Sequence, residues 1–116
     1  MKKLITLLAI AFCLNARAQY VAIPDSNFVH YLKTIVAIAF KGDSLNINST
    51  LVTSTTHTIN VDNRSISNLS GVQYFASLTS LSCGTNSLTS LPVLPNTLIY
   101  LECWQNSLTS LPGLPV

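Results

Sequence analysis

The C-terminal half of this chain repeats itself with a period of 20 residues. The pattern L-x-x-L-x-C-x-x-N-x-L-x-x-L-P covers residues 78–92 and returns, position for position, at residues 98–112. An imperfect earlier copy begins at Ile59, 22 residues before its matched position in the next copy. A fixed period in this range indicates one supersecondary unit stacked on copies of itself, so the repeat constrains the fold more than any local propensity.

The spacing of these leucines, cysteines and asparagines resembles that of leucine-rich repeats. The tails LPVLP and LPGLP, at residues 91–95 and 111–115, are similar to the short LPxLP class of bacterial repeats. Residues 23–28 and 69–75 resemble the N-terminal region of secreted and surface-attached, internalin-like bacterial proteins. The resemblance covers roughly residues 20–116. It implies an α/β repeat solenoid that works as a binding or adhesion module and carries no catalytic residues.

The repeat predicts three coils, each with a short parallel strand, beginning near Thr58, Ser80 and Tyr100. The prolines favour an extended, polyproline-like outer wall, because proline lacks the N–H that a helix interior needs. The last coil reaches Val116 without a polar cap, which suggests a fragment or an interrupted array. We therefore expect a signal peptide at residues 1–18, an N-terminal helical cap and connector at residues 19–57, and leucine-rich repeats at residues 58–116 with the last coil incomplete.

Residues 1–18 have the features of a secretory signal. These features are a basic start, an apolar run over residues 4–14, and a small-x-small triplet that ends at Ala18. We expect cleavage between Ala18 and Gln19, which would place the mature protein outside the cell or on its surface. The apolar run is shorter than the about 20 residues of a membrane-spanning helix, so we expect no membrane span.

Loss of the signal changes the charge of the chain. The full sequence has a formal net charge of +2, whereas residues 19–116 keep three basic side chains against four acidic ones and carry −1. No basic stripe remains to neutralise phosphates, which disfavours nucleic acid as a partner. The four acidic residues are widely spread and offer no carboxylate pair, and His30 and His57 fit no catalytic pattern.

The segment before the repeats predicts one amphipathic helix. Pro24 and Asp25 are typical of a helix start, with Asp25 available to cap free N–H groups. Apolar residues then follow at helical spacing, which predicts a helix of about 14 residues that ends near Gly42 and covers the first coil. The β-branched residues around 35–40 leave a buried strand open as the alternative. We expect disorder at residues 19–22, a short strand at 45–48 and a polar connector at 49–58.

Alternation along each strand predicts which side chains point inward. Cys83 and Cys103 fall at inward positions; a disulfide between them would need a strained dihedral, and they lack the histidine of a zinc site and the base of a nucleophile. We expect buried apolar thiols, with neither a metal nor a cofactor. The inward set is Ile59, Val61, Leu81, Cys83, Leu101 and Cys103.

Asn86 and Asn106 occupy the turn position of the repeat. An amide there can donate to and accept from backbone groups of neighbouring coils. The resemblance implies that these side chains form an asparagine ladder. Arg64 interrupts the ladder in the first coil, so either Asn63 takes over its role or this coil bends differently.

Outward strand positions line up in rows across the coils. The rows are Thr58, Ser80 and Tyr100; Asn60, Ser82 and Glu102; Asp62, Gly84 and Trp104; and Asn63, Thr85 and Gln105. Solenoids usually bind on this concave face, and an exposed tryptophan beside a carboxylate suits an interface anchor or a sugar-stacking platform. The alternative is that Trp104 only covers a frayed last coil. The predicted binding residues are Asn60, Asp62, Ser82, Tyr100, Glu102 and Trp104.

Taken together, these features predict an exported leucine-rich-repeat module that binds a protein or glycan on its concave face without catalysis. A second hypothesis is a structural spacer, or a fragment of a longer bacterial surface protein. A third is the substrate-selecting repeat region of an effector ubiquitin ligase. All three rest on analogy with the repeat fold.

Overall fold

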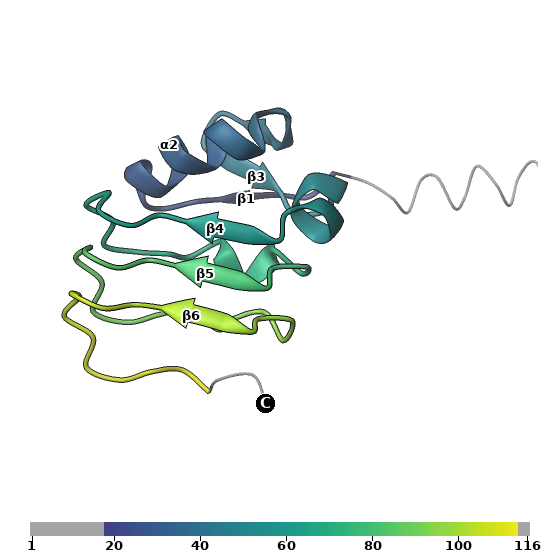
Figure 1. Ribbon diagram of the computed structural model, residues 1–116. Helices are drawn as coiled ribbons and strands as arrows, with labels where there is room; N and C mark the ends of the chain where they lie inside the picture. The colour runs from purple at the N-terminus through teal and green to yellow at the C-terminus, as the bar shows by residue number, and fades with distance from the viewer. Residues whose placement is uncertain (1–17, 114–116) are drawn as a thin grey trace, which may run out of the picture.

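The chain folds into two three-stranded sheets, one antiparallel and one parallel, joined by short helices (Figure 1). The computed structural model describes residues 18–113, so the predicted signal peptide lies outside the described residues except for its last position, as do residues 114–116. In chain order the elements are β1 (Tyr20–Ala22), α2 (Ser26–Ile35), the 3₁₀ helix η1 (Ala37–Ala39), β2 (Phe40–Lys41), β3 (Ser44–Asn46), the π-helix η2 (Leu51–Thr55), β4 (Thr58–Asn60), the 3₁₀ helix η3 (Val72–Tyr74), β5 (Ser80–Ser82) and β6 (Tyr100–Glu102).

The parallel sheet has the strand order β4–β5–β6 and is built from the repeated segment. Thr58, Ser80 and Tyr100 lie opposite one another at the starts of the three strands, so the pairing register follows the sequence repeat. The strands lie side by side and point the same way (Figure 1). The prediction of three short parallel strands beginning near these residues is confirmed.

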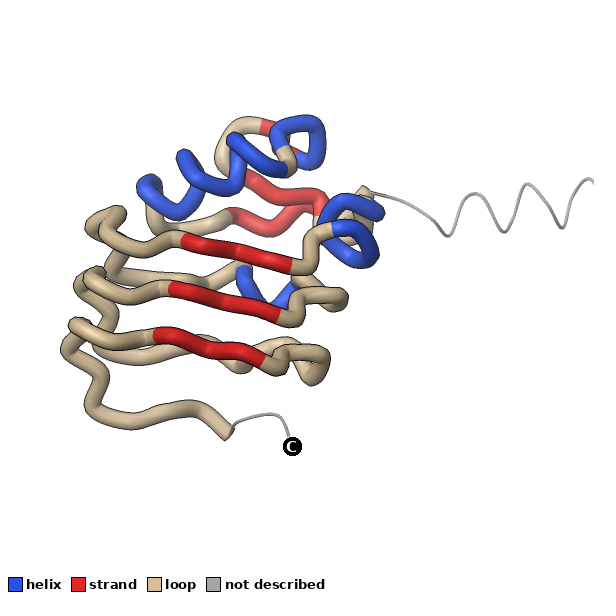
Figure 2. Tube along the Cα trace, in the orientation of Figure 1, coloured by secondary structure: helices blue, strands red, loops and turns tan. Residues whose placement is uncertain are grey.

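The chain returns from strand to strand by two different routes. Between β4 and β5 it passes through η3, whereas residues 83–99, between β5 and β6, form turns without a helix (Figure 2). Pro92 and Pro95 lie in this second return, where a missing N–H breaks no helical hydrogen bond. The return between β5 and β6 thus contains no helix, while the earlier return is partly helical.

Inward side chains of the parallel strands form the core together with leucines of the return segments. Leu101 and Cys103 are partly exposed, because β6 is the outermost strand of the described sheet. Each fully buried aliphatic side chain contributes about 1.5–3 kcal/mol through the hydrophobic effect. The predicted inward positions are therefore confirmed for the first two strands, where the fully buried side chains are Ile59, Val61, Leu81 and Cys83, with Leu88 behind them.

The two repeat asparagines join neighbouring turns of the chain. The Oδ1 atom of Asn86 accepts from the backbone N–H of Ile66 at 2.9 Å, and its amide donates to the carbonyl of Val61 at 2.8 Å. Asn106 accepts from the N–H of Leu88 at 3.0 Å and donates to the carbonyl of Cys83 at 2.9 Å. Each amide thus satisfies a donor and an acceptor of the preceding turn, the role that we predicted for this position.

Helix α2 is shorter than the predicted helix of about 14 residues, because it ends at Ile35. The chain then passes through η1, and Phe40 and Lys41 pair with β3 around a turn in which Gly42 has a φ of +60°. Antiparallel pairing through this turn satisfies backbone groups that a longer helix would have used. The alternative of a buried strand over residues 35–40 was also wrong, since only Phe40 of that segment is in a strand.

The N-terminal segment is ordered, contrary to our prediction of disorder at residues 19–22. Strand β1 pairs antiparallel with β3, whose other edge pairs with β2. The predicted strand near residues 45–48 corresponds to β3, and the predicted connector at 49–58 contains η2. Strands β1 and β2, of three and two residues, lie outside the repeat and carry too little alternation to be recognised in the sequence, so their pairing with β3 decides where they form.

Helix α2 lies on the β4 side of the parallel sheet (Figure 1) and reaches β4 through Tyr31. The N–H of Asn60, on the edge of β4 that faces away from β5, donates to the hydroxyl of Tyr31 at 3.1 Å. The guanidinium of Arg64 lies 4.9 Å from the centre of the Tyr31 ring. These contacts resolve the interruption at Arg64: its side chain rests on the helix, and a second left-handed residue, Ser65 (φ 56°), bends this turn differently from the later ones.

Candidate functional site

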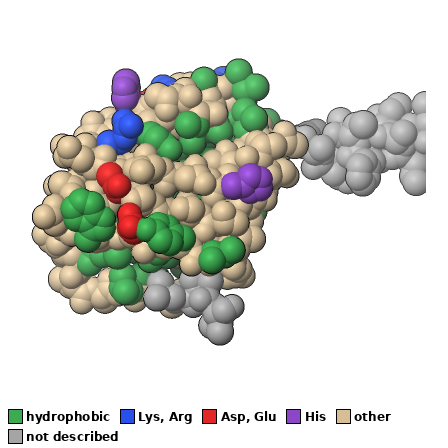
Figure 3. Space-filling model, viewed as in Figure 1, with side chains coloured by type: hydrophobic (Ala, Val, Ile, Leu, Met, Phe, Trp, Pro, Cys, Tyr) green, Lys and Arg blue, Asp and Glu red, His purple; other side chains and the backbone are tan. Residues whose placement is uncertain are grey.

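The outward side chains of β4, β5 and β6 share one face of the molecule. The register places Asn60 beside Ser82, and Ser82 beside Glu102, as the repeat predicts. On this face, acidic side chains lie close to hydrophobic ones (Figure 3). The described strands thus bring the predicted binding residues together, and their hydrogen bonds show what each contributes.

Two carboxylates meet at a single serine hydroxyl. The Oγ atom of Ser82 lies 2.8 and 2.9 Å from the two carboxylate oxygens of Asp62, and 3.2 Å from Oε2 of Glu102. The prediction that the acidic residues form no carboxylate pair was therefore wrong. The two acidic residues are far apart in the sequence. Asp62 follows β4 and Glu102 lies in β6, and these are the two neighbours of β5, which contains Ser82. The repeat register could therefore have revealed the pair.

Trp104 lies against the one outward position that has no side chain. A Cβ atom built on Gly84 would come within 2.7 Å of the indole Cε2 atom, so the ring occupies the space above this glycine. The N–H of Gly84 donates to the Asp62 carboxylate at 2.7 Å. Trp104 remains 52 % exposed, so its indole rests on Gly84 without being buried.

Tyr100 is held from its own strand by Glu102. Its hydroxyl donates to Oε1 of Glu102, while the residue as a whole is 51 % exposed. The hydrogen bond to the Glu102 carboxylate, aided by slight desolvation and the nearby negative charges of Glu102 and Asp62, raises the pKa of Tyr100 above its ordinary value. The face therefore keeps a phenol donor fixed on one of its two carboxylates.

Ser82 and Asn60 have structural roles that the sequence did not predict. Ser82 is only 7 % exposed, so it serves mainly to position the carboxylates of Asp62 and Glu102. The Oδ1 atom of Asn60 accepts from the N–H of Asp62 at 3.0 Å and fixes the backbone just after β4. The groups that remain accessible to a ligand are the two aromatic rings and the carboxylates.

The two cysteines differ in accessibility. Both are free thiols; Cys83 is fully buried and Cys103 is partly exposed. Burial, together with the neighbouring Cys103 and Asp62, raises the pKa of the Cys83 thiol to about 12. The prediction of buried apolar thiols is confirmed for Cys83, whereas Cys103 is more open because no described strand lies beyond β6.

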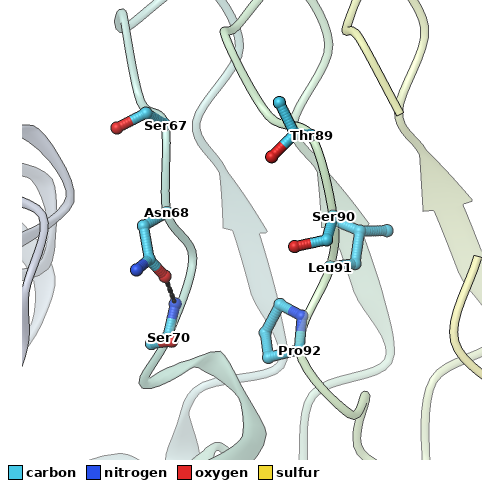
Figure 4. Close-up of a pocket in the computed structure, with 7 residues that line it drawn as sticks. All are labelled: Ser67, Asn68, Ser70, Thr89, Ser90, Leu91 and Pro92. Carbon is cyan, nitrogen blue, oxygen red and sulfur yellow. Dashed lines mark hydrogen bonds between the residues drawn. The ribbon is translucent and has the colours of Figure 1, made fainter. Parts of the chain in front are cut away.

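A separate pocket lies on the return segments, away from the outward face of the strands (Figure 4). It has a volume of about 270 Å³, and the Asn68 side chain accepts from the N–H of Ser70 at 2.8 Å within it. It contains no charged group and no exposed aromatic ring, so it offers a ligand weaker anchors than the strand face does. Its lining residues are Ser67, Asn68, Ser70, Thr89, Ser90, Leu91 and Pro92.

Within residues 18–113, no group of three or more histidine, cysteine, aspartate or glutamate side chains is arranged to hold a metal ion. No helix of this part of the chain is long and apolar enough to cross a lipid bilayer. Comparison of the chain with models of known families, with curated proteins and with solved structures gave no match.

Proposed function

We propose that this chain is an exported leucine-rich-repeat module that binds a protein or glycan through the outward face of β4, β5 and β6, without catalysis. The face supplies two exposed aromatic rings and two carboxylates, all within reach of one ligand. Aromatic side chains are the most frequent energetic anchors of interfaces and the usual platforms for sugar rings. This arrangement of Tyr100, Glu102, Trp104 and Asp62 is the observation that carries the proposal.

The repeat-solenoid part of the proposal is supported by three features. Equivalent residues of the repeat pair in register between β5 and β6. The amides of Asn86 and Asn106 bridge successive turns in the same way. Helix α2 satisfies the free edge of β4 through Tyr31, as a cap over the first coil would.

The test of binding requires a ligand, so the secreted chain is first screened on glycan and surface-protein arrays. We expect Trp104→Ala and Tyr100→Ala each to weaken binding to any hit by tenfold or more, about 1.4 kcal/mol or above, which is typical of interface anchors. Thr89→Ala and Thr109→Ala change exposed side chains of the return segments and should leave binding unchanged. Calorimetry with the identified ligand measures each loss.

A structural spacer is the second candidate, because the contact between the indole of Trp104 and Gly84 also suits a ring that only shields the sheet. Binding that survives the loss of both aromatic rings would favour this alternative. Export is tested separately by N-terminal sequencing of secreted material, which should begin at Gln19. Finding Met1 on exported protein would refute the signal-peptide assignment.

A further inference from the structure

The carboxylates of Asp62 and Glu102 share one hydrogen-bond donor, the hydroxyl of Ser82. A serine hydroxyl has a single hydrogen to donate, yet oxygens of both side chains lie within 3.2 Å of the Oγ atom of Ser82. When this hydrogen points to Asp62, Oε2 of Glu102 has no donor; when it points to Glu102, Asp62 keeps only the N–H of Gly84 on its Oδ1 atom. Two acidic side chains thus meet at one hydroxyl that can donate to only one of them at a time.

Within the described part of the chain, no cationic side chain forms a salt bridge with either of them. The salt bridge found there joins Lys33 to Asp43, and Arg64 rests on the ring of Tyr31. The remaining donors to the pair are neutral: the N–H of Gly84 and the hydroxyl of Tyr100. The face therefore keeps a net negative charge that a bound cation would offset.

The surroundings of the two carboxylates favour an organic cation. Tyr100 begins β6 and Trp104 follows its end, two residues to either side of Glu102, and each of the two aromatic residues is about half exposed. Aromatic faces attract cations through their quadrupole, and the planar guanidinium can stack on a ring while it donates to carboxylates on its edge. A neutral sugar could stack on Trp104 but would leave both negative charges uncompensated.

We propose that this face receives an arginine side chain of a protein partner, with the guanidinium directed at Asp62 and Glu102 and its flat face against an aromatic ring. The proposal rests on the proposed function, because it names the partner class for the same surface. Of the two ligand classes in the proposed function, protein or glycan, this proposal names a protein. Its basis is charge complementarity together with the shared hydroxyl and the exposed rings.

The probe is a short neutral-ended peptide, acetyl-Gly-Arg-Gly-amide, compared with its citrulline counterpart, which has the same shape without the charge. The full secreted chain is labelled with ¹⁵N, and shifts of the Trp104 indole N–H and the Gly84 amide are followed during titration. Trp104 is the only tryptophan in the sequence, so its indole signal is unambiguous. We expect saturable shifts with the arginine peptide and binding about tenfold weaker or more with the citrulline peptide.

Two variants remove the charges while keeping the shape. Asp62→Asn and Glu102→Gln should each weaken arginine binding severalfold, and raising the salt concentration should weaken it further. Asp43→Asn is the matched control, because it removes an exposed carboxylate that pairs with Lys33 away from this face. Conserved amide spectra outside the strand face would show that the variants remain folded.

Equal binding of the arginine and citrulline peptides, or an absence of saturable shifts, would overturn the proposal. So would a titration in which calcium chloride shifts the two signals and the arginine peptide does not, since the pair would then be an inorganic cation site. An array ligand that is a neutral glycan and depends on Trp104, with no effect of the arginine peptide, would leave the proposed function standing and refute only this inference.

Discussion

The carboxylate of Asp25 ties the start of helix α2 to the backbone at Ser67, 42 residues further along the chain. Its Oδ1 atom accepts from the N–H of Phe28 in the first turn of the helix, at 3.1 Å. Its Oδ2 atom accepts from the N–H of Ser67 at 2.8 Å and from that of Asn68 at 3.1 Å. One side chain therefore caps the helix and also holds it against the first turn of the repeated segment.

Replacement of Asp25 by Asn should cost about 2–3 kcal/mol at pH 7, because an amide cannot accept all of these hydrogen bonds and presents a donor to one set of N–H groups. Burial opposes ionisation of Asp25, but the hydrogen bonds from Ser67, Phe28 and Asn68 outweigh it and lower the pKa of this carboxyl. Urea denaturation of both proteins measures the difference. Asp43→Asn, at an exposed salt bridge, should cost less than about 1 kcal/mol.

The same pKa shift predicts how stability depends on pH. A lowered pKa in the folded state means that folding favours the ionised form, so the stabilisation is complete above the ordinary value of 3.8 that the unfolded chain has. It is then lost as the pH falls through the folded pKa. The gap between wild type and Asp25→Asn in free energy of unfolding should therefore narrow in acid. A gap that is constant from pH 7 to pH 3 would contradict this account.

Replacement of Asn86 by Ala should cost about 1–3 kcal/mol, since it leaves backbone groups of two turns without partners. Its Oδ1 atom accepts from two N–H groups, and the two hydrogens of its amide are shared among three carbonyls within 3.1 Å. Asn106→Ala should cost less, because its Oδ1 atom accepts from one N–H group and it lies in a more exposed turn. A denaturation series with equal or reversed losses would refute the bridging role of these amides.

The cysteines should react with iodoacetamide at different rates. In folded protein at pH 8, Cys103 should be alkylated first, because it is partly exposed. Cys83 should react only after unfolding, because it is fully buried and its pKa is raised to about 12, which leaves little thiolate. Mass spectrometry of peptides from folded and unfolded samples follows both sites, and Cys103→Ser isolates the second. Rapid labelling of Cys83 in folded Cys103→Ser protein would argue against its burial.

Replacement of Gly84 by Ala should displace the indole of Trp104, because the new Cβ would come within 2.7 Å of the ring. The change in stability should stay below about 1 kcal/mol, since the group that must move is an exposed side chain. The fluorescence and near-ultraviolet circular dichroism of this single tryptophan report the movement. Gly113→Ala is the control, because no heavy atom lies within 4 Å of its added Cβ. Identical spectra for wild type and Gly84→Ala would show that the ring does not rest on this glycine.

Part of the strand face was predictable from the repeat and part was not. The rows that contain Tyr100, Glu102 and Trp104 follow from the period alone, because parallel strands in register align equivalent residues. The convergence of Asp62 and Glu102 on Ser82 was not predicted, because the two acidic residues are far apart in the sequence and fall in different rows of the strand face. The near burial of Ser82 was missed as well, because alternation gives the direction of a side chain and not what covers it.

The sequence by itself determined the parallel strands, their register, the inward core positions and the bridging role of Asn86, because these depend on a period and on residue type. Only the tertiary structure decided where helix α2 ends, that residues 20–22 form a strand, and that Asp25, Tyr31 and Arg64 join the helix to the first turn. These features depend on contacts between segments that share no pattern in the sequence. Which backbone groups are hydrogen-bonded and which apolar surfaces are buried depends on neighbours that only the complete fold brings together. These tertiary contacts outweigh local propensity.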